Sequence, residues 1–393
     1  MANVSINDDV LISKINAVDW EFSDENTQYL THNIHRYSGK FIPQIAKEVM
    51  LMISQEGDLI LDPYVGSGTT LLEGILINRK CIGIDLNPLA ILISKVKTTV
   101  VPEDKLNKLE EYFSAFINWL SNDQLSIFDL ASNKSFSTEL SQASKERKAS
   151  NWNNKWYQTH VLEQLVLIYN EIEKIEDESC KNIAVLSFSD ILRKFSNASS
   201  KYPNVMYDKN SKTKPVPARA FLESLCSTII KVRELNKALK NIDPVVRIIQ
   251  DSNTKMEIED QTVDSIITHP PYIGSIPYAE YGVLSLHWLG YDSKKLDHEL
   301  TGGRRQSKNV VSRFVEDYRA MISESYRVLK KDGFAFFMVG NPTVRGEIVA
   351  LNDITVELAK NVGFEIFNVC ARNGRNRRGN MMGQEFLIFL RKK

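Results

Sequence analysis

The sequence contains few cysteines, and the four that it has lie far apart. They are Cys81, Cys180, Cys226 and Cys370, and no two of them form a CxxC pair. This spacing argues against a zinc site and against a disulfide framework, and it is typical of proteins kept in a reducing cytoplasm. We therefore expect a cytoplasmic protein without a bound metal.

Long apolar runs and an excess of one charge are also absent. No stretch approaches the roughly 20 apolar residues of a membrane-spanning helix, and the N-terminal MANVSINDDV lacks the basic and apolar regions of a signal peptide. Lysine plus arginine and aspartate plus glutamate each total 49, so the neutral net charge does not indicate a polyanionic partner. Basic residues nevertheless cluster in 209–219, 304–308 and 372–378. A local basic face is enough to hold a nucleic-acid backbone.

Seven short apolar runs, rich in β-branched residues, predict strands. They are 58–62, 81–85, 245–250, 263–268, 333–339, 364–370 and 385–391. Most are continuously apolar rather than alternating, which is typical of strands covered on both faces of a parallel sheet. Apolar residues recur at helical spacing between the strands, for example in 69–78 and 314–330. The alternation predicts a doubly wound, mostly parallel, seven-stranded α/β sheet of the Rossmann-like kind.

The alternation of strands and helices is interrupted between residues 92 and 244. We find no convincing strand there, and the apolar residues follow helical faces. Two polar stretches, 131–151 and 196–217, are expected to be loops. We therefore divide the 393 residues into a first half of the α/β domain, a helical insertion and a second half of the α/β domain, over 1–98, 99–244 and 245–393.

A glycine-rich turn follows the first predicted strand. Residues 59–70 read LILDPYVGSGTT, so a buried strand ends at Asp62 and a helix starts near Thr69. Glycines allow a sharp turn and the close approach of a ligand, and the helix start presents free N–H groups. The next strand ends in Asp85, at the place where an acid binds the ribose of a nucleoside. The turn lacks the full GxGxxG pattern and the Walker A lysine, which argues against a nicotinamide cofactor and a phosphate-cradling loop.

Together these residues resemble the DNA amino-methyltransferases, which use S-adenosylmethionine to methylate cytosine N4 or adenine N6. Residues 62–70 match the family's cofactor loop DPFxGSGTT, 83–88 match GIDxNP, and 35–43 are similar to its N-terminal cofactor segment. The resemblance implies that the cofactor is bound by Tyr37, Lys40, Phe41, Pro43, Asp62, Pro63, Gly66, Ser67, Gly68, Thr69, Thr70, Asp85 and Leu86. It also implies that Asp251 and Ser252, after the third predicted strand, lie near the cofactor's adenine.

A second motif, His269-Pro270-Pro271-Tyr272, follows the strand predicted at 263–268. Its prolines cannot continue the hydrogen bonding of a sheet, so the backbone leaves the strand here. An exocyclic base amine is a poor nucleophile because its lone pair is delocalised into the ring. Hydrogen bonds accepted from both of its N–H groups would draw the nitrogen towards tetrahedral geometry. The first side chain and the first proline carbonyl are suitable acceptors, and the aromatic ring can stack on a base swung out of the duplex.

The chain departs from the family at the first position of this motif. The family has aspartate, asparagine or serine there, whereas this chain has His269. A neutral imidazole retains one acceptor nitrogen and can replace such an oxygen. Thr268 before the motif is similar to the cytosine-N4 group, in which Ser-Pro-Pro-Tyr follows threonine. The resemblance therefore implies a site-specific methyltransferase that flips cytosine out of double-stranded DNA and methylates N4, with adenine N6 as the alternative.

Arginines in two glycine-containing loops are suited to contact phosphates or base edges. They are Arg304, Arg305, Arg375, Arg377 and Arg378. The helical insertion lies between the two motifs and is a candidate target-recognition region. Two other classes stay open, namely an RNA methyltransferase acting on a guanine amine and a nucleic-acid-binding protein that has lost catalysis. No nuclease motif is evident, so any cognate restriction or defence nuclease would be a separate partner.

Overall fold

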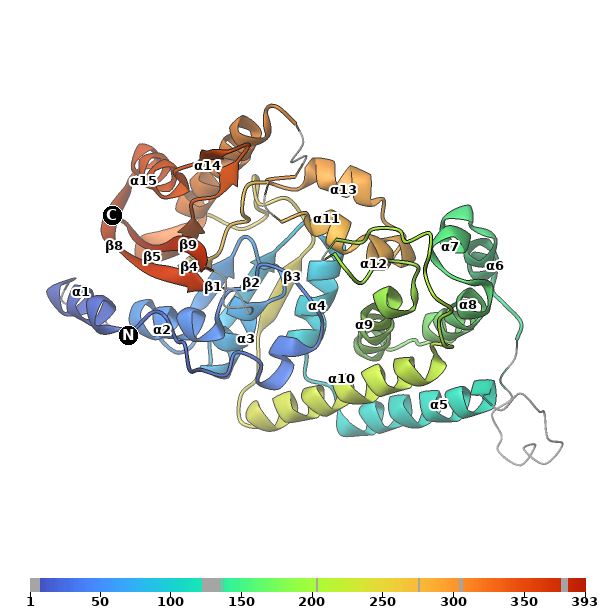
Figure 1. The fold of residues 1–393 in the computed structure, drawn as a ribbon. Coiled ribbons are helices and arrows are strands. Elements are labelled where there is room, and N and C mark those ends of the chain that lie inside the picture. Colours follow the sequence, from blue (N-terminus) through green and yellow to red (C-terminus); the bar gives the residue numbers. More distant parts are fainter. Residues whose placement is uncertain are drawn as a thin grey trace.

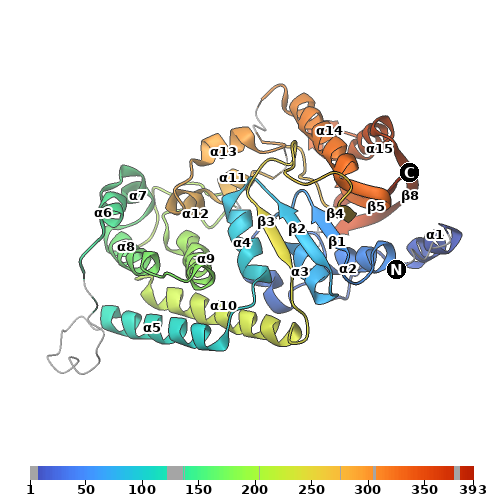
Figure 2. The same ribbon diagram turned by 180° about the vertical axis from the view of Figure 1, so that it is seen from behind.

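The computed structural model describes residues 8–121, 136, 138–202, 204–274, 276–303, 307–375 and 381–393. One sheet dominates it, with strand order β3-β2-β1-β4-β5-β9-β8 (Figures 1 and 2). Its strands are β1 (Leu59–Asp62), β2 (Lys80–Ile84), β3 (Val246–Ile249), β4 (Val263–Thr268), β5 (Leu329–Gly340), β8 (Phe364–Arg375) and β9 (Met381–Lys392). A separate two-stranded hairpin consists of β6 (Thr343–Val344) and β7 (Glu347–Ile348).

The predicted seven-stranded sheet is confirmed, and its mostly parallel character with it. The pairs β1–β2, β1–β4, β2–β3 and β4–β5 are parallel. Only β9 runs against its neighbours, because it is antiparallel to both β5 and β8. This reversal brings the beginning of β9 to the edge of the sheet at which the parallel strands end.

Helices cover both faces of the sheet. Phe336 of β5 packs in a core cluster with α1 (Asp8–Ala17), α2 (Pro43–Ile53) and α3 (Thr69–Leu76) on one face. Its neighbour Phe337 packs on the other face with α14 (Val310–Val328) and α15 (Leu351–Val362), which lie together beside β5 and β8 (Figure 2). Successive side chains of a strand point to opposite faces. A continuously apolar strand therefore fits both cores, as the sequence pattern indicates.

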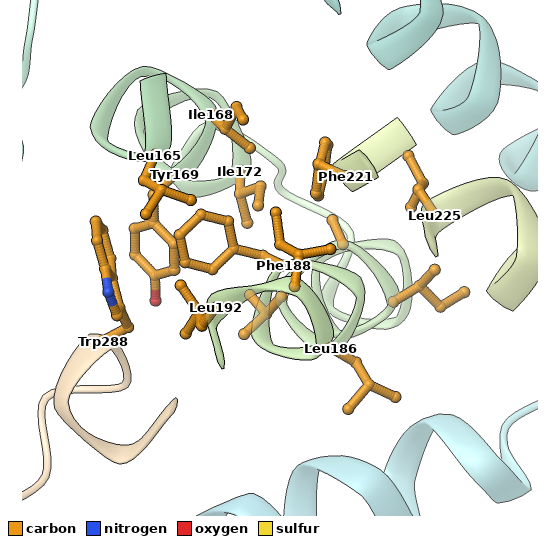
Figure 3. Packing of buried hydrophobic residues seen from close by; sticks show 14 of the residues in the cluster. Leu165, Ile168, Tyr169, Ile172, Leu186, Phe188, Leu192, Phe221, Leu225 and Trp288 are labelled. Carbon is orange, nitrogen blue, oxygen red and sulfur yellow. The ribbon is translucent and has the colours of Figure 1, made fainter. Parts of the chain in front are cut away.

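A lobe of helices lies beside the sheet (Figure 1). It comprises η1 (Leu30–Asn33), α4 (Pro88–Thr98), α5 (Glu103–Ser121), α6 (Gln142–Ala149), α7 (Asn151–Trp156), α8 (Thr159–Glu173), α9 (Glu178–Phe195), α10 (Ala218–Ala238), α11 (Tyr278–Tyr281), α12 (Val283–Trp288) and α13 (Ser293–Glu299). The described part of 99–244 contributes no strand to the sheet. Trp288, from the second half of the chain, packs against Tyr169 and Phe188 of this lobe (Figure 3). None of the helices in the described ranges is long and apolar enough to span a bilayer.

The expectation that 131–151 is a loop is wrong for its second part. Helices α6 and α7 occupy 142–149 and 151–156. Serine caps start both of them, because Ser141 accepts a hydrogen bond from the Ser144 N–H at 3.2 Å and Ser150 accepts one from Asn153 at 3.5 Å. The polar composition reflects solvated helices held by caps, which the periodicity of apolar residues does not reveal.

The strand order contains a topological switch point between β1 and β4. The chain runs outward from β1 to β2 and β3, and then returns to form β4 on the other side of β1. The ends of β1 and β4 are joined by a hydrogen bond from Thr268 Oγ1 to Asp62 Oδ1, 2.7 Å long. Ligands of doubly wound sheets bind at this kind of position, outside the carboxyl ends of the strands.

Candidate active site

The glycine turn after β1 is held in a backbone conformation that needs glycine. Gly66 and Gly68 have φ values of +49° and +76°, which side chains disfavour. A Cβ at Gly68 would lie 2.8 Å from Ser94 Oγ, so α4 also packs too closely for a side chain there. The Gly66 N–H donates to Asp85 Oδ2 at 2.9 Å. This bond fastens the turn to the end of β2.

A cavity opens where the turn meets the ends of β1, β2 and β4. Its lining residues are Tyr37, Gly39, Tyr64, Gly66, Asp85, Leu86, Asn87, Asp251, Asn253, His269, Pro271, Tyr278, Leu300 and Thr301. Among these described residues, two are acidic and none is lysine or arginine. The aromatic rings of Tyr37 and Tyr278 have centroids 6.0 Å apart. Carboxylates and aromatic faces favour a cationic ligand over a phosphate.

The lining also retains polar atoms that a ligand can satisfy. The Tyr64 hydroxyl and the Asn87 amide nitrogen are buried and make no well-formed hydrogen bond within the described part of the chain. Burial raises the pKa of Asp85 to about 6, and hydrogen bonds from the Asn87 and Gly66 N–H groups oppose this rise. Asp85 is therefore ionised at pH 7 and can accept hydrogen bonds from ribose hydroxyls. These features fit S-adenosylmethionine, which has a nucleoside at one end and a sulfonium cation in the middle.

The His-Pro-Pro-Tyr motif reaches the same cavity from β4. His269 and Pro271 line it, and the His269 ring lies beside Phe41 with a centroid distance of 5.7 Å. His269 Nε2 is 3.1 Å from the Tyr272 hydroxyl, which donates a hydrogen bond to Glu385 Oε1 at 2.5 Å. Burial lowers the pKa of His269 from its ordinary value. The imidazole is therefore neutral at pH 7 and retains one acceptor nitrogen.

The predicted cofactor-binding residues divide into two groups. Those that line the cavity are Tyr37, Gly66, Asp85, Leu86 and Asp251. The others support it from behind. For example, Lys40 Nζ donates to the carbonyl oxygens of His32 and His35, at 3.0 and 2.9 Å, and so braces the segment that carries Tyr37.

Other members of the second group hold the turn and the strand ends. Buried Lys97 donates to Ser67 Oγ at 3.4 Å, and the Asn253 amide donates to the Pro63 carbonyl at 2.6 Å. The Ser252 and Thr254 hydroxyls are 2.8 Å apart. The remaining residues start helices or pack against the motif, namely Pro43 at the start of α2, Gly68, Thr69 and Thr70 at the start of α3, and Phe41 against His269.

Most of the arginines predicted to contact DNA lie outside the residues that the structure describes. Arg304, Arg305, Arg377 and Arg378 lie outside the described residues, and Arg375 ends β8. The basic segment 372–378 is not wholly a loop, because β8 continues to residue 375. Its first residue, Arg372, is buried and forms ion pairs with Glu385 at 3.7 Å and Glu21 at 4.0 Å. This arginine is part of the protein interior rather than of a phosphate-binding surface.

Sequence reasoning missed several residues of the site. Tyr64, Asn253 and Thr301 line the cavity, and Glu385 bonds to Tyr272. Asn253 and Thr301 lie in irregular segments with no periodicity to identify them. Glu385 did carry a signal, because it is a single acid at the start of the apolar run predicted at 385–391. A buried acid requires a partner, and here the partners come from distant parts of the chain.

Comparison with known proteins agrees with this geometry. A protein-family model described as DNA methylase matches residues 7–96. Type II methyltransferase M.MvaI of Kocuria varians is 26% identical over 394 aligned residues, covering 86% of this chain and 83% of the relative. M.MjaII of Methanocaldococcus jannaschii is 24% identical, covering 82% and 75%, and M.BsoBI of Geobacillus stearothermophilus is 26% identical, covering 69% and 55%.

The family model lies within the first half of the α/β domain, whereas the alignments with M.MvaI and M.MjaII cover 86% and 82% of the chain. Over most of its length the chain is similar to DNA amino-methyltransferases. It is therefore a methyltransferase, and S-adenosylmethionine is its cofactor. Which amine of which base it methylates is a separate question, which depends on the His-Pro-Pro-Tyr loop.

Proposed function

We propose that this protein methylates the N4 amine of cytosine in double-stranded DNA, at a specific sequence and after the base has been flipped out of the duplex. One observation carries the proposal, namely that His269 and Pro271 line the same cavity as Asp85 and the glycine turn. An amine bound at His269 would therefore lie next to the methyl donor. Thr268 before the motif favours cytosine over adenine, as in the cytosine-N4 group.

The chain's own residues would activate the amine by accepting hydrogen bonds. The neutral His269 ring accepts from one N–H and the Pro270 carbonyl from the other, which localises the lone pair on nitrogen. When bound, the cofactor would supply a methyl group on a cationic sulfur. As the nitrogen takes the methyl, the sulfur would keep the bonding electrons as a neutral thioether, and the nitrogen would release one proton to the neutral His269 ring or to solvent. Positioning supplies most of the acceleration, because both partners are held in one cavity. The Tyr37 and Tyr278 rings would face the cofactor's cationic part, and the Asp85 carboxylate would accept hydrogen bonds from its ribose hydroxyls.

A basic cleft between the helical insertion and the segments 35–38 and 278–285 is suited to hold the DNA backbone. It has a volume of about 530 Å³ and shares Tyr37 and Tyr278 with the cofactor cavity. Five basic side chains line it against a single acid, Asp190; the basic residues are Arg36, Arg193, Lys194, Lys201 and Lys214. Lys201 and Lys214 come from the insertion, which is consistent with its proposed role in target recognition. Such a local charge excess attracts phosphates although the whole chain is neutral.

Charge removal in this cleft tests the DNA-binding surface. We expect K201A/K214A to weaken DNA binding and to lower the slope of log affinity against log salt by about two, because each phosphate contact contributes roughly 0.9. The matched control is K331A/K360A, which removes two exposed lysines from the far side of the sheet. Fluorescence anisotropy at several salt concentrations measures both. Equal slopes for the two double variants would remove the cleft from the DNA interface.

The central experiment identifies the methylated base. The purified protein is incubated with unmethylated genomic DNA and labelled S-adenosylmethionine. The DNA is then digested to nucleosides, and the labelled nucleoside is identified by mass spectrometry. We expect label in N4-methylcytosine. Label in N6-methyladenine would keep the mechanism and change the base, whereas label only in tRNA supplied in parallel would move the enzyme to the guanine-amine class. Cofactor binding without any transfer would indicate a silent DNA-binding protein.

A further inference from the structure

The His269 ring takes part in a buried chain of polar groups that extends away from the cofactor cavity. Its Nε2 is 3.1 Å from the Tyr272 hydroxyl, and this hydroxyl is 2.5 Å from Glu385 Oε1. Glu385 Oε2 in turn lies 3.7 Å from Arg372 Nε. The side chains of Glu385 and Arg372 are only 8% and 4% exposed. These groups form a polar network that runs from the histidine through the tyrosine to the carboxylate and the guanidinium, and its charged end is buried.

The number of protons that each group can donate fixes the direction of each hydrogen bond in this network. Glu385 faces the permanent positive charge of Arg372, so it is a carboxylate and can only accept. Tyr272 has a single hydroxyl hydrogen and must donate it to Glu385. The tyrosine oxygen can then only accept from His269, whose Nε2 must carry the ring proton. In a neutral imidazole the lone pair is then left on Nδ1.

We propose that Glu385, acting through Tyr272, fixes His269 as the Nε2–H tautomer and thereby keeps Nδ1 as the acceptor for the substrate amine. Glu385 and Arg372 are positioning residues, because they act on the amine only through Tyr272 and His269. The use of Nδ1 in catalysis rests on the proposed function, whereas the tautomer itself does not. A serine or aspartate at this position needs no such device, since its oxygen accepts in every orientation.

The order and direction of the strands bring the members of this network together. Glu385 lies at the beginning of β9, where it pairs in register with Arg372 of β8 on one side and with Gly340 of β5 on the other. A Cβ at Gly340 would lie 2.8 Å from Tyr272 Cε1. Only glycine lets the tyrosine ring lie against the strand and reach Glu385. The antiparallel direction of β9 thus delivers a carboxylate to the catalytic edge of the sheet.

Tautomers can be read directly in the cofactor-free protein. A long-range ¹H–¹⁵N correlation spectrum of ¹⁵N-histidine-labelled protein at pH 8 resolves the ring nitrogens of its six histidines, and the signals missing in H269S belong to His269. We expect the Nε2–H form in the wild type. In E385M/R372M both members of the ion pair are removed, so no unpaired charge stays buried. Of the two hydrogen-bond partners of the Tyr272 hydroxyl, only His269 Nε2 then remains to accept its hydrogen, so we expect the opposite tautomer, Nδ1–H.

Kinetics tests whether the tautomer matters for catalysis. We expect Y272F, which keeps the aromatic ring, to lower kcat roughly tenfold through loss of the tautomer lock, with little change in the affinity for S-adenosylmethionine. In an H269S background the same change should cost less than about twofold, because serine has no tautomer to fix; this coupling separates positioning from packing. An Nδ1–H wild type, an unchanged tautomer in E385M/R372M, or equal losses in both backgrounds would overturn the inference. Failure to methylate DNA would overturn the proposed function and leave the tautomer result intact.

Discussion

At the scale of single residues, burial decides the protonation of the acids that follow the first two strands. Burial raises the pKa of both Asp62 and Asp85 to about 6. The Asp62 carboxylate binds groups of the protein itself, because it accepts hydrogen bonds from Thr268 Oγ1 and the Tyr64 N–H. Asp85 faces the cavity. Two acids in similar positions thus have different roles, one structural and one directed at the ligand.

Removing the charge of Asp85 should weaken cofactor binding. We expect D85N to raise the Kd for S-adenosylmethionine about 10- to 100-fold, since hydrogen bonds to a charged group contribute roughly 1.5–3 kcal/mol. The wild-type Kd should also rise as the pH falls through about 6, where Asp85 takes up a proton. D85N should lack that step. Calorimetric titration between pH 5 and 8 measures both effects, with exposed Asp24→Asn as the control. Wild-type affinity in D85N would remove Asp85 from the cofactor site.

The histidine of the catalytic motif should give this enzyme an acid limb in its pH profile. Burial and Arg372 lower the pKa of His269, whereas Glu385 opposes them. Protonation turns both ring nitrogens into donors, so kcat should fall as the pH drops below the ordinary value of about 6.5, and it should not depend on this group above that pH. H269S should lose the limb, because serine does not titrate. Single-turnover rates from pH 5 to 8 provide the comparison, and a limb that persists in H269S would assign it to another group.

At the scale of elements, the glycine turn combines a positive φ with close packing against α4. These two constraints can be separated, because Gly57 also has a positive φ, +83°, but nothing lies within 4 Å of its Cβ position. A side chain at Gly57 therefore meets backbone strain alone. At Gly68 it meets strain together with a contact 3.1 Å from the Ser94 Cα.

We expect G68A to be clearly more damaging than G57A. Strain in the left-handed region costs about 1 kcal/mol, and displacement of α4 should add about 1–3 kcal/mol in G68A. G68A should also reduce the affinity for the cofactor, since it moves the turn, whereas G57A should not. Urea unfolding and cofactor titration of the two variants measure these effects. Equal losses of stability in G68A and G57A would show that α4 can move away from the added side chain with no loss of folding free energy.

At the scale of the whole molecule, the helical insertion is not an independent appendage. Leu235 and Leu239 near the end of α10 belong to the same core cluster as β1 and α2. Trp288, from the other side of the insertion in sequence, is 3% exposed within the lobe, and its indole N–H donates to the Tyr157 hydroxyl at 3.3 Å. The C-terminal end of the insertion therefore shares a core with the sheet, and the lobe buries a tryptophan from the second half of the chain. Simple deletion of the insertion would therefore expose apolar surface.

This shared core predicts cooperative unfolding. W288A should destabilise the protein by about 3–5 kcal/mol and lower the temperature of one single transition. W119A, which removes a half-buried tryptophan within α5, should cost less. Differential scanning calorimetry supplies the measurement, because calorimetric and van't Hoff enthalpies agree for a single cooperative unit. Two transitions, of which W288A moves only one, would show that the lobes unfold separately.

The sequence by itself determined the parts of this protein whose signals are local. Seven apolar runs indicate the seven strands, and the Gly66–Gly68 turn after Asp62 indicates a nucleoside site, since strand burial and left-handed turns leave their marks on neighbouring residues. The helices α6 and α7 were missed because side-chain caps start them, while the polar composition of 131–151 resembles that of a loop.

Only the tertiary structure decided which distant segments meet. The Thr268–Asp62 bond joins residues about 200 positions apart, and Glu385 reaches Tyr272 because β9 runs antiparallel between β5 and β8. Strand order and direction depend on long-range packing, which no local pattern encodes. The sequence therefore identified His269 as the unusual member of its motif, and the fold supplied the buried carboxylate that sets the orientation of its protons.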